Sequence, residues 1–413
     1  MTITIISRHR AALAAGASLM LLATAPAVAA DLGGDCCADL EERVAELEAT
    51  AARKGNRKVS LTVSGQVHTG VLFFDDGEEQ NAYVTDNDNT STRFRFVGNA
   101  KINADWKAGF LIEVEAEVAS SNLVTQLNDD PNSALSIRHS AWWIESKQFG
   151  RVTVGQTSPA TDDIILADAA GAAPAAFSDQ LIGNSIFFRR NDGTLTDLSA
   201  NVVSGGSFDT ARRNLVRYDS PLFQGAKLVA SWGEDDFWDV ALWYAGKLGD
   251  FKIVGGIGYF QDTDGFAAGL EQEEIKGSIS VLHEPSGLFG SFAYVNRDFA
   301  NPALDELDYY YFNAGIVAKS LLPIGKTVFY GEYAEGDGVS TADPANPAGT
   351  LNVGAVTDAE LRVWGFGVVQ HVTAAEMEIY ALYKNLDLDA VAGGAAVNTQ
   401  EIDIVYTGAR IRF

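Results

Sequence analysis

The stretch KVSLTVSGQVHTGVLF, residues 58–73, alternates in polarity and decides how the rest of the chain is interpreted. One phase carries apolar side chains, at Val59, Leu61, Val63, Val67, Val71 and Phe73. The other phase carries Lys58, Ser60, Thr62, Ser64, Gln66 and His68. A two-residue period indicates a strand whose two faces meet different surroundings. The run is also much longer than the roughly five or six residues of an ordinary strand.

The same alternation returns throughout the chain. Arginine alternates with phenylalanine in RFRF (93–96), and glutamate alternates with apolar residues in IEVEAEV (112–118). The chain ends in YTGARIRF (406–413), with two arginines on one phase, so its terminus is predicted to be a strand. A weaker alternation at 194–203 is left out because it would make the number of strands odd. Sixteen strand-like runs are predicted, at 57–73, 92–103, 106–119, 135–146, 150–157, 212–220, 225–233, 236–245, 250–261, 271–283, 287–297, 306–319, 326–335, 359–372, 375–387 and 399–413.

The connections between these runs alternate between short and long. Short connections fall at 104–105, 148–150, 221–225, 246–250, 284–287, 320–325 and 373–374. Long connections fall at 75–91, 120–134, 158–211, 261–270, 298–305, 334–358 and 388–398, with 233–235 as a short member of this set. Tight turns at one end and long loops at the other are typical of an up-and-down transmembrane barrel.

Two architectures could use strands of this kind. In a membrane barrel the apolar face meets lipid, closure satisfies the backbone hydrogen bonds, and the other face lines a water-filled channel. A soluble sandwich would need a very large shared core, and a partner for each inward charge at Arg93, Arg95, Glu113, Glu115 and Glu117. We therefore predict an all-β fold, a 16-stranded antiparallel transmembrane β-barrel. A one-sided soluble β protein is the alternative.

Composition excludes two other classes of protein. The chain of 413 residues is 47% hydrophobic, so it is not disordered as a whole. Its 30 Lys and Arg residues face 55 Asp and Glu residues, a net charge of −25, which argues against a nucleic-acid-binding protein. In a channel, this net charge favours cations in the vestibules.

The N-terminal residues are predicted to direct export. Residues 1–30 combine a cationic start, an apolar segment at 11–25 and a small-residue cleavage site at 27–29, which is the pattern of a signal peptide. A transmembrane helix is the alternative for this stretch. The adjacent Cys36 and Cys37 form no disulfide framework, which leaves a bond between subunits or no role.

Residues 31–56 are predicted to form a short periplasmic segment before the barrel domain at 57–413. Apolar residues recur within 37–55 at three- and four-residue steps, which predicts a coiled-coil-like helix. The helix is too short to associate alone in water, so it either joins subunits held together by the barrel or lies on its own protein.

Several segments resemble a known family, the alphaproteobacterial porins. STRFRFVGNAKINADWKAGFLIEVE (91–115) resembles an early porin hairpin, and SAWWIESKQFGRVTVGQTSPATDD (140–163) resembles the strands before a constriction loop. RRNLVRYDSPLFQGAKLVASWGE (212–234) resembles the strand after that loop, and residues 37–65 resemble the family's N-terminal segment. Phe413 resembles the terminal aromatic signal that barrel-insertion machinery recognises.

The resemblance implies a general porin of the bacterial outer membrane. Such a protein is a homotrimer, surrounded by outer-membrane lipid and lipopolysaccharide, through which ions and small hydrophilic solutes diffuse passively. No cofactor and no metal are expected.

The resemblance also implies that the loop at 158–211 folds inward and narrows the pore. For the acidic side of the constriction it offers Asp162, Asp163, Asp168 and Asp179. The basic wall expected opposite them comprises Arg93, Arg95, Arg138, Arg189, Arg190, Arg212, Arg213 and Arg217. Glu113, Glu115 and Glu117 are expected to line the pore as well. Opposed charges would create a transverse field that orients dipolar solutes, although each residue could equally be an ordinary solvated charge.

Three other functions are weighed against a diffusion channel. The sequence has no Gly-x-Ser-x-Gly elbow and no His-rich metal spacing, so we expect no enzyme activity. A sugar-selective channel would need an aromatic track, and a phosphate-selective channel would need a basic track that the three glutamates at 113, 115 and 117 interrupt. An adhesive protein could hold cations through the acidic loop at 75–89, but the spacing does not complete a calcium site.

Overall fold

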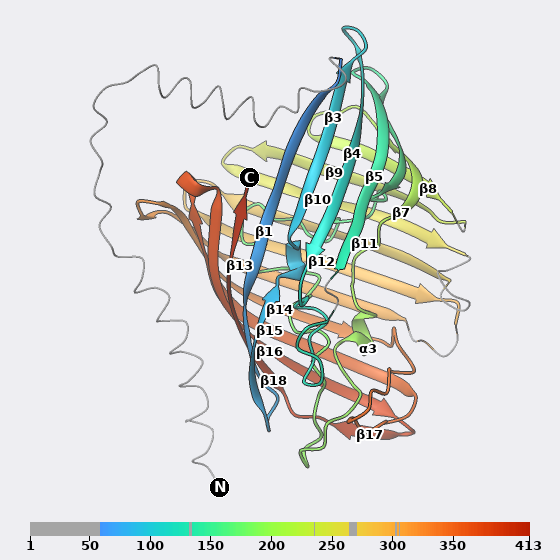
Figure 1. Ribbon diagram of the computed structural model, residues 1–413, viewed down its shortest axis with the longest axis vertical. Helices are drawn as coiled ribbons and strands as arrows, with labels where there is room; N and C mark the ends of the chain where they lie inside the picture. The colour runs from blue at the N-terminus through green and yellow to red at the C-terminus, as the bar shows by residue number, and fades with distance from the viewer. Residues whose placement is uncertain (1–57, 132–133, 235, 264–270, 302–303, 305) are drawn as a thin grey trace.

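The computed structural model describes residues 58–131, 134–234, 236–263, 271–301, 304 and 306–413. Within them, 18 strands form one antiparallel sheet that closes on itself as a barrel (Figure 1). The first strand, β1 (Ser60–Asp75), pairs with the last, β18 (Ile402–Arg412), with Gln66 opposite Arg412. Closure gives both edge strands a partner, so the sheet has no open edge.

The other consecutive strands pair with each other, except β2 with β3 and β17 with β18. The strands are β2 (Gln80–Asp86), β3 (Arg93–Lys101), β4 (Trp106–Glu117), β5 (Ala134–Ser146), β6 (Gly150–Thr157), β7 (Arg213–Asp219), β8 (Ala226–Gly233), β9 (Trp238–Leu248), β10 (Phe251–Asp262), β11 (Gln272–His283), β12 (Leu288–Phe299), β13 (Leu307–Leu322), β14 (Gly325–Asp337), β15 (Val356–Val372), β16 (Met377–Ala392) and β17 (Ala395–Asn398). Helical structure is limited, among the described residues, to η2 (Asp88–Thr90), α3 (Asn201–Ser204) and η3 (Thr373–Ala375).

The 18 strands occupy 16 positions around the barrel. β1 pairs with β3 over its first half and with β2 over its second half, so β2 and β3 are two pieces of one barrel strand. β16 pairs in the same way with β17 and β18. The predicted 16-stranded antiparallel barrel is therefore confirmed, and each of the 16 predicted runs overlaps an observed strand.

Two predicted long connections are wrong. The segment 75–91 contains β2, and the segment 388–398 is an extension of β16, a two-residue turn and β17. That turn is Gly393-Gly394, with φ of 58° and 80°, values that glycine adopts without the strain of a side chain. The omitted run at 194–203 forms no strand and ends in α3.

The last residue completes the closure. The backbone of Phe413 exchanges two hydrogen bonds with Gly65, of 2.9 and 3.1 Å. A Cβ added at Gly65 would lie 2.5 Å from Cζ of the Phe413 ring, so glycine is needed for the ring to lie across β1. The aromatic terminus is thus a structural part of the seam.

The outward phase of the strands is apolar. Ile257 on β10, Ile279 on β11 and Phe366 on β15 are each about half exposed, and their inward-pointing neighbours are covered. Aromatic residues such as Trp142 and Trp364 share this outer face. In the bilayer this surface meets lipid chains, so its exposure to solvent carries no penalty there.

The inward face of the strands is only partly exposed to water. The loop 158–211 lies inside the barrel and buries the inner face of β12–β18, including Tyr309, Tyr380 and Leu382. In Figure 1 its short helix α3 lies against the orange strands, in agreement with the contacts of α3 with β14 and β15. Apolar loop residues such as Ile164 and Phe208 fill the space in between.

The predicted signal peptide at 1–30 and most of the segment at 31–56, with Cys36 and Cys37, lie outside the described residues. Among the described residues, none of the helices has the length and apolarity that a membrane span requires.

We expect Ile257→Arg to lower the free energy of unfolding by about 2–4 kcal/mol, because it puts a charge against lipid near the middle of β10. Thr62→Arg, which points into the lumen from β1, should cost much less. Denaturant titration of both variants in lipid vesicles measures the difference. Equal losses would show that the two faces do not meet different solvents.

Candidate functional site in the barrel interior

The loop 158–211 is fixed to the barrel wall at its beginning. Arg217 on β7 donates hydrogen bonds from Nη1 to the carbonyls of Ser158 and Pro159, at 3.0 and 2.9 Å. The backbone N–H of Thr161 donates to Oδ2 of Asp239 on β9, at 2.7 Å. These buried contacts set the direction in which the loop enters the lumen.

Further anchors follow across the opposite wall. The carbonyl of Ala169 accepts from Lys252 on β10 at 3.1 Å, and the carbonyl of Ala170 accepts from Lys326 on β14 at 2.6 Å. His371 on β15 lies with Nε2 2.8 Å from the carbonyl of Gly171. Lys384 on β16 then donates to Oε1 of Gln180 at 2.7 Å. The loop is therefore held against the wall from β9 to β16.

This arrangement leaves the open part of the lumen on one side, bounded by β1 and β3–β8, which we call the passage. Ser60 and Thr62 on β1 point inward and are exposed, and the Arg95 side chain on β3 is 43% exposed. By contrast, the inward Tyr380 and Lys384 on β16 are each 1% exposed. The pore is consequently off-centre.

A cluster of three arginines and two glutamates lines the passage. Glu113 on β4 is bound by Arg93 and Arg95 on β3 and by Arg138 on β5, whose Nε lies 3.0 Å from its Oε1. Glu115 accepts from Arg138 Nη1 at 2.6 Å. The register explains the contacts, because Arg93 faces Glu115 and Arg95 faces Glu113 across neighbouring strands. The three bases outnumber the two acids.

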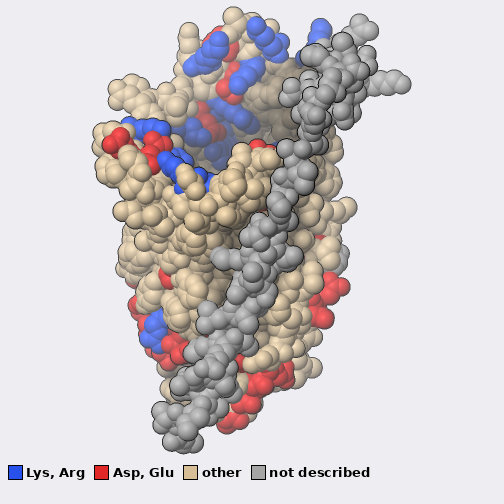
Figure 2. Space-filling view, turned by 90° about the vertical axis from the view of Figure 1, so that its left-hand side faces the viewer, with Lys and Arg blue, Asp and Glu red and all other residues tan. Residues whose placement is uncertain are grey.

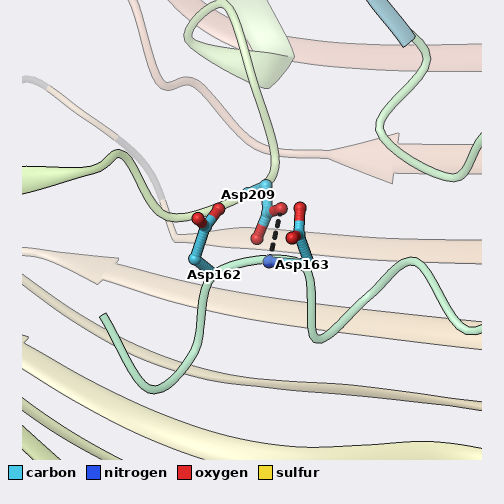
Figure 3. A group of neighbouring side chains, drawn as sticks. All are labelled: Asp162, Asp163 and Asp209. Carbon is cyan, nitrogen blue, oxygen red and sulfur yellow. Dashed lines mark hydrogen bonds between the residues drawn. The ribbon is translucent and has the colours of Figure 1, made fainter. Parts of the chain in front are cut away.

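The two ends of the loop meet beside this cluster (Figure 3). Asp162 and Asp163 come from its beginning and Asp209 from its end, and their carboxylates lie within 4.8 Å of one another. Arg212 lies 3.2 Å from Asp162 Oδ2, and Lys276 lies 3.2 Å from Asp209 Oδ1. These two bases offset part of the negative charge of the three acids.

The other predicted residues are not brought together at one place. Arg189 binds Asp76 at 2.8 Å, and Arg213 binds the buried Asp262 at 2.8 Å, both toward the end with the long loops. Glu117 is buried at the end of β4. The remaining predicted residues hold the shape of the loop or anchor it to the wall. Asp168 accepts hydrogen bonds from the N–H groups of Ala170, Gly171 and Ala173, and Asp179 accepts from Ser207 and Phe208. The backbone of Arg190 bonds Thr194 and Gln400, and the side chain of Arg217 binds Asp219.

The sequence analysis did not single out several inward bases at the end with the short turns. They are Arg151, Lys227, Lys252 and Lys326, to which the terminal Arg410 and Arg412 add. Each falls on the polar phase of its strand, so extending the alternation to every strand would have found them.

Burial raises the pKa of four carboxyl groups of the loop, those of Asp162, Asp179, Asp197 and Asp209. Burial raises the pKa of Asp179 to about 8, and the nearby Asp209 acts in the same direction. Burial also raises the pKa of Asp162 to about 7, with Asp163 adding to the effect. Both pKa values lie above 3.8, the ordinary value for an aspartate. Between pH 3.8 and about 8 the folded loop therefore binds more protons than the unfolded chain. The stability of the docked loop therefore falls as pH rises through that window.

Comparison with known proteins identifies the family. The model of the Gram-negative porin family matches residues 15–407, so the chain belongs to this family and forms a channel in the outer membrane. No curated protein matches the sequence.

Solved structures share the fold at low identity. OprB of Pseudomonas putida has a TM-score of 0.58 at 11% identity, covering 91% of this chain and 97% of that one. An anion-selective porin from Comamonas acidovorans has a TM-score of 0.57 at 15% identity, covering 86% and 100%. OmpT of Vibrio cholerae, described in a trimer form, has a TM-score of 0.54 at 16% identity, covering 86% and 99%.

We expect Asp179→Asn to weaken the pH dependence of loop docking. Hydrogen exchange of amides within 176–208, corrected for the intrinsic rate, should show protection that declines from pH 5 to pH 8 in the wild type and declines less in the variant. Asp192→Asn, at an exposed position of the same loop, should follow the wild type. A decline unchanged by Asp179→Asn would contradict the assigned role.

We expect Arg138→Ala to shift ion selectivity toward cations, because Glu113 and Glu115 each lose a base in the passage. Zero-current potentials in a KCl gradient measure this shift. Arg362→Ala removes the same charge from the outer face, where Arg362 binds Asp387 and Asp389, and should change the potential little. Equal shifts in both variants would show that the cluster does not line the conducting path.

Proposed function

We propose that this porin lets ions and small hydrophilic solutes diffuse passively through the off-centre passage. The observation that carries the proposal is the contrast between the two inner walls. The wall of β12–β18 is covered by the loop 158–211, whereas β1 and β3–β8 present exposed polar and charged side chains. Water and polar solutes can therefore cross only on the second side.

The composition of the passage favours general diffusion over a sugar-selective channel. Its inward residues are small, polar or charged, as at Ser60, Thr62, Arg95 and Thr153. Trp143 is an inward aromatic residue, but it is 4% exposed and lies beneath the Arg151 guanidinium, 4.5 Å from its ring centre. A row of exposed rings on which a sugar could slide is absent from the described part of this wall.

We propose that the acid–base arrangement narrows the passage and orients solutes there. The arginine cluster with Glu113 and Glu115 forms one side, and Asp162, Asp163 and Asp209 with Arg212 form the other. Charged groups held in fixed positions create a field that favours dipolar over apolar solutes. The remaining loop acids, Asp168 and Asp179, maintain the shape of the loop.

The proposal extends to assembly and origin. A homotrimer is supported by the trimer form described for the similar Vibrio cholerae OmpT, and an alphaproteobacterial origin by the N-terminal segment at 37–65. Contact with lipopolysaccharide and recognition of Phe413 by barrel-insertion machinery agree with the outer-membrane location. The channel role of the family supports a function without catalysis.

A flux assay tests the proposal directly. Vesicles containing the purified protein should swell in isosmotic solutions of small sugars, at rates that decrease smoothly with solute size. Protein-containing vesicles that stay impermeable to all of these solutes would refute passive diffusion. Saturation by one sugar at micromolar concentration would instead indicate a selective channel.

Substitution on β1 tests where solutes pass. We expect Thr62→Trp to lower single-channel conductance, because the indole would project into the passage. Val67→Trp adds the same ring on the lipid-facing side of the same strand and should leave conductance unchanged. If Thr62→Trp conducted like the wild type, solutes would have to pass elsewhere in the barrel.

A further inference from the structure

Charge is segregated along the axis of the barrel. Figure 2 shows Lys and Arg gathered in the hollow at one end of the molecule and Asp and Glu gathered toward the opposite end. The basic end carries the short turns and the acidic end carries the long loops, which in outer-membrane barrels face the periplasm and the outside respectively. The net charge of −25 therefore says little about the interior at the periplasmic end.

Two of the three glutamates expected to interrupt a basic track, Glu113 and Glu115, are paired with bases in the structure. Glu113 is bound by three arginines, and Glu115 by Arg138. At the periplasmic end of β16, Glu378 is bound by Arg410 and Arg412. A solute entering from this end meets bases whose charge is not cancelled.

A pocket of about 610 Å³ lies at this end of the passage, between β5 and β8, and we call it the vestibule pocket. Its charged lining residues are Glu145, Lys147, Arg151, Arg217, Asp219 and Lys227. Register brings them together, since Arg151 faces both Glu145 and Asp219 across adjacent strands. Most of the charged lining residues therefore lie on strands of the wall, and Lys147 lies in the turn between β5 and β6.

Both acids of the vestibule pocket already have other partners. Asp219 binds Arg217 at 2.9 Å and Lys227 at 2.8 Å, and Glu145 binds Lys107 at 3.0 Å. No carboxylate of the described residues lies within ion-pair distance of Arg151 or Lys147. The pocket thus has four bases and two acids, with a surplus of two positive charges.

Arg151 is also held in place. Its Nε donates to the Thr153 hydroxyl at 3.1 Å, and its guanidinium lies over the Trp143 ring at 4.5 Å. These contacts fix the plane of the guanidinium and leave its terminal N–H groups without a carboxylate partner. A planar fork of this kind matches the oxygens of a carboxylate or an oxyanion.

We propose that the vestibule pocket binds small dianions, such as sulfate or a short dicarboxylate, and concentrates them at the periplasmic mouth of the channel. The surplus of two charges matches one dianion, and the volume accommodates an organic dianion of a few carbon atoms. This inference rests on the proposed diffusion function, because the pocket opens into the passage. The acidic outer end attracts cations instead of anions, so dianions bind differently from the two sides of the membrane.

Single-channel recording tests the proposal with sulfate as the probe. Replacing chloride by sulfate on one side at constant potassium concentration should reduce the current in a saturable way. Sulfate on the periplasmic side should act at lower concentration than sulfate on the outer side. Succinate should act like sulfate, and the monoanion acetate should have little effect. To identify the periplasmic side, the substitution Gln148→Cys is made in the β5–β6 turn of a chain whose Cys36 and Cys37 are serine. The new thiol is then modified from one side of the membrane.

The double variant Arg151→Gln/Lys227→Gln should weaken sulfate binding about tenfold or more, because two charged hydrogen-bond donors are lost. The matched control is Lys247→Gln/Lys319→Gln, which removes two charges at the same end but outside the pocket, where both lysines contact Glu284. It should change sulfate binding less than about twofold. If the double variant does not assemble, Lys227→Gln alone carries the test with a smaller loss.

The outcomes separate the two claims. Equal weakening in the double variant and its control, or equal action of sulfate from both sides, would overturn the pocket and leave the channel intact. Absence of any conductance would overturn the diffusion function and the pocket with it.

Discussion

The structure depends on one constraint, that no backbone N–H or C=O group can remain unpaired in the hydrocarbon core of a membrane. An open sheet would leave two edges without partners, at a cost of several kcal/mol for each group. Pairing of β1 with β18 removes both edges, and the hydrogen bonds between Phe413 and Gly65 carry the ladder to the last residue. Once the ring is closed, every strand has one face toward lipid and one toward the interior.

The interior of the closed barrel is too wide for the side chains of the wall alone to fill. The loop 158–211 solves this by packing its apolar residues on the inner face of β12–β18, while lysines of β10, β14 and β16 bind its polar groups. The half that remains open is polar and rich in charge. Function therefore arises from an uneven filling of the barrel, since the dry half fixes the loop and the wet half conducts.

Much of the fold could be predicted from the sequence, because the two-residue period is a local property that survives in each strand. The strands β2 and β17 were not predicted because they are short and are separated from β3 and β18 by breaks in the alternation. The inward position of Arg93, Arg95 and Glu113 also followed from phase alone. Their pairing did not, since it depends on register between strands, and Arg138 reaches both glutamates only because β5 shifts register beside Glu113. The apolar contacts of the loop could not be foreseen, because no period marks them.

Cysteine accessibility along the first half of β1 tests the central claim of a two-faced wall most directly. Each position from Ser60 to Val67 except Gly65, where a side chain would clash with the Phe413 ring, is replaced by cysteine in a chain whose Cys36 and Cys37 are serine, and a water-soluble thiol reagent is added while the current is recorded. The account predicts that positions 60, 62, 64 and 66 react and that the current falls, whereas 61, 63 and 67 stay protected by lipid. Reactivity without this alternation would contradict it.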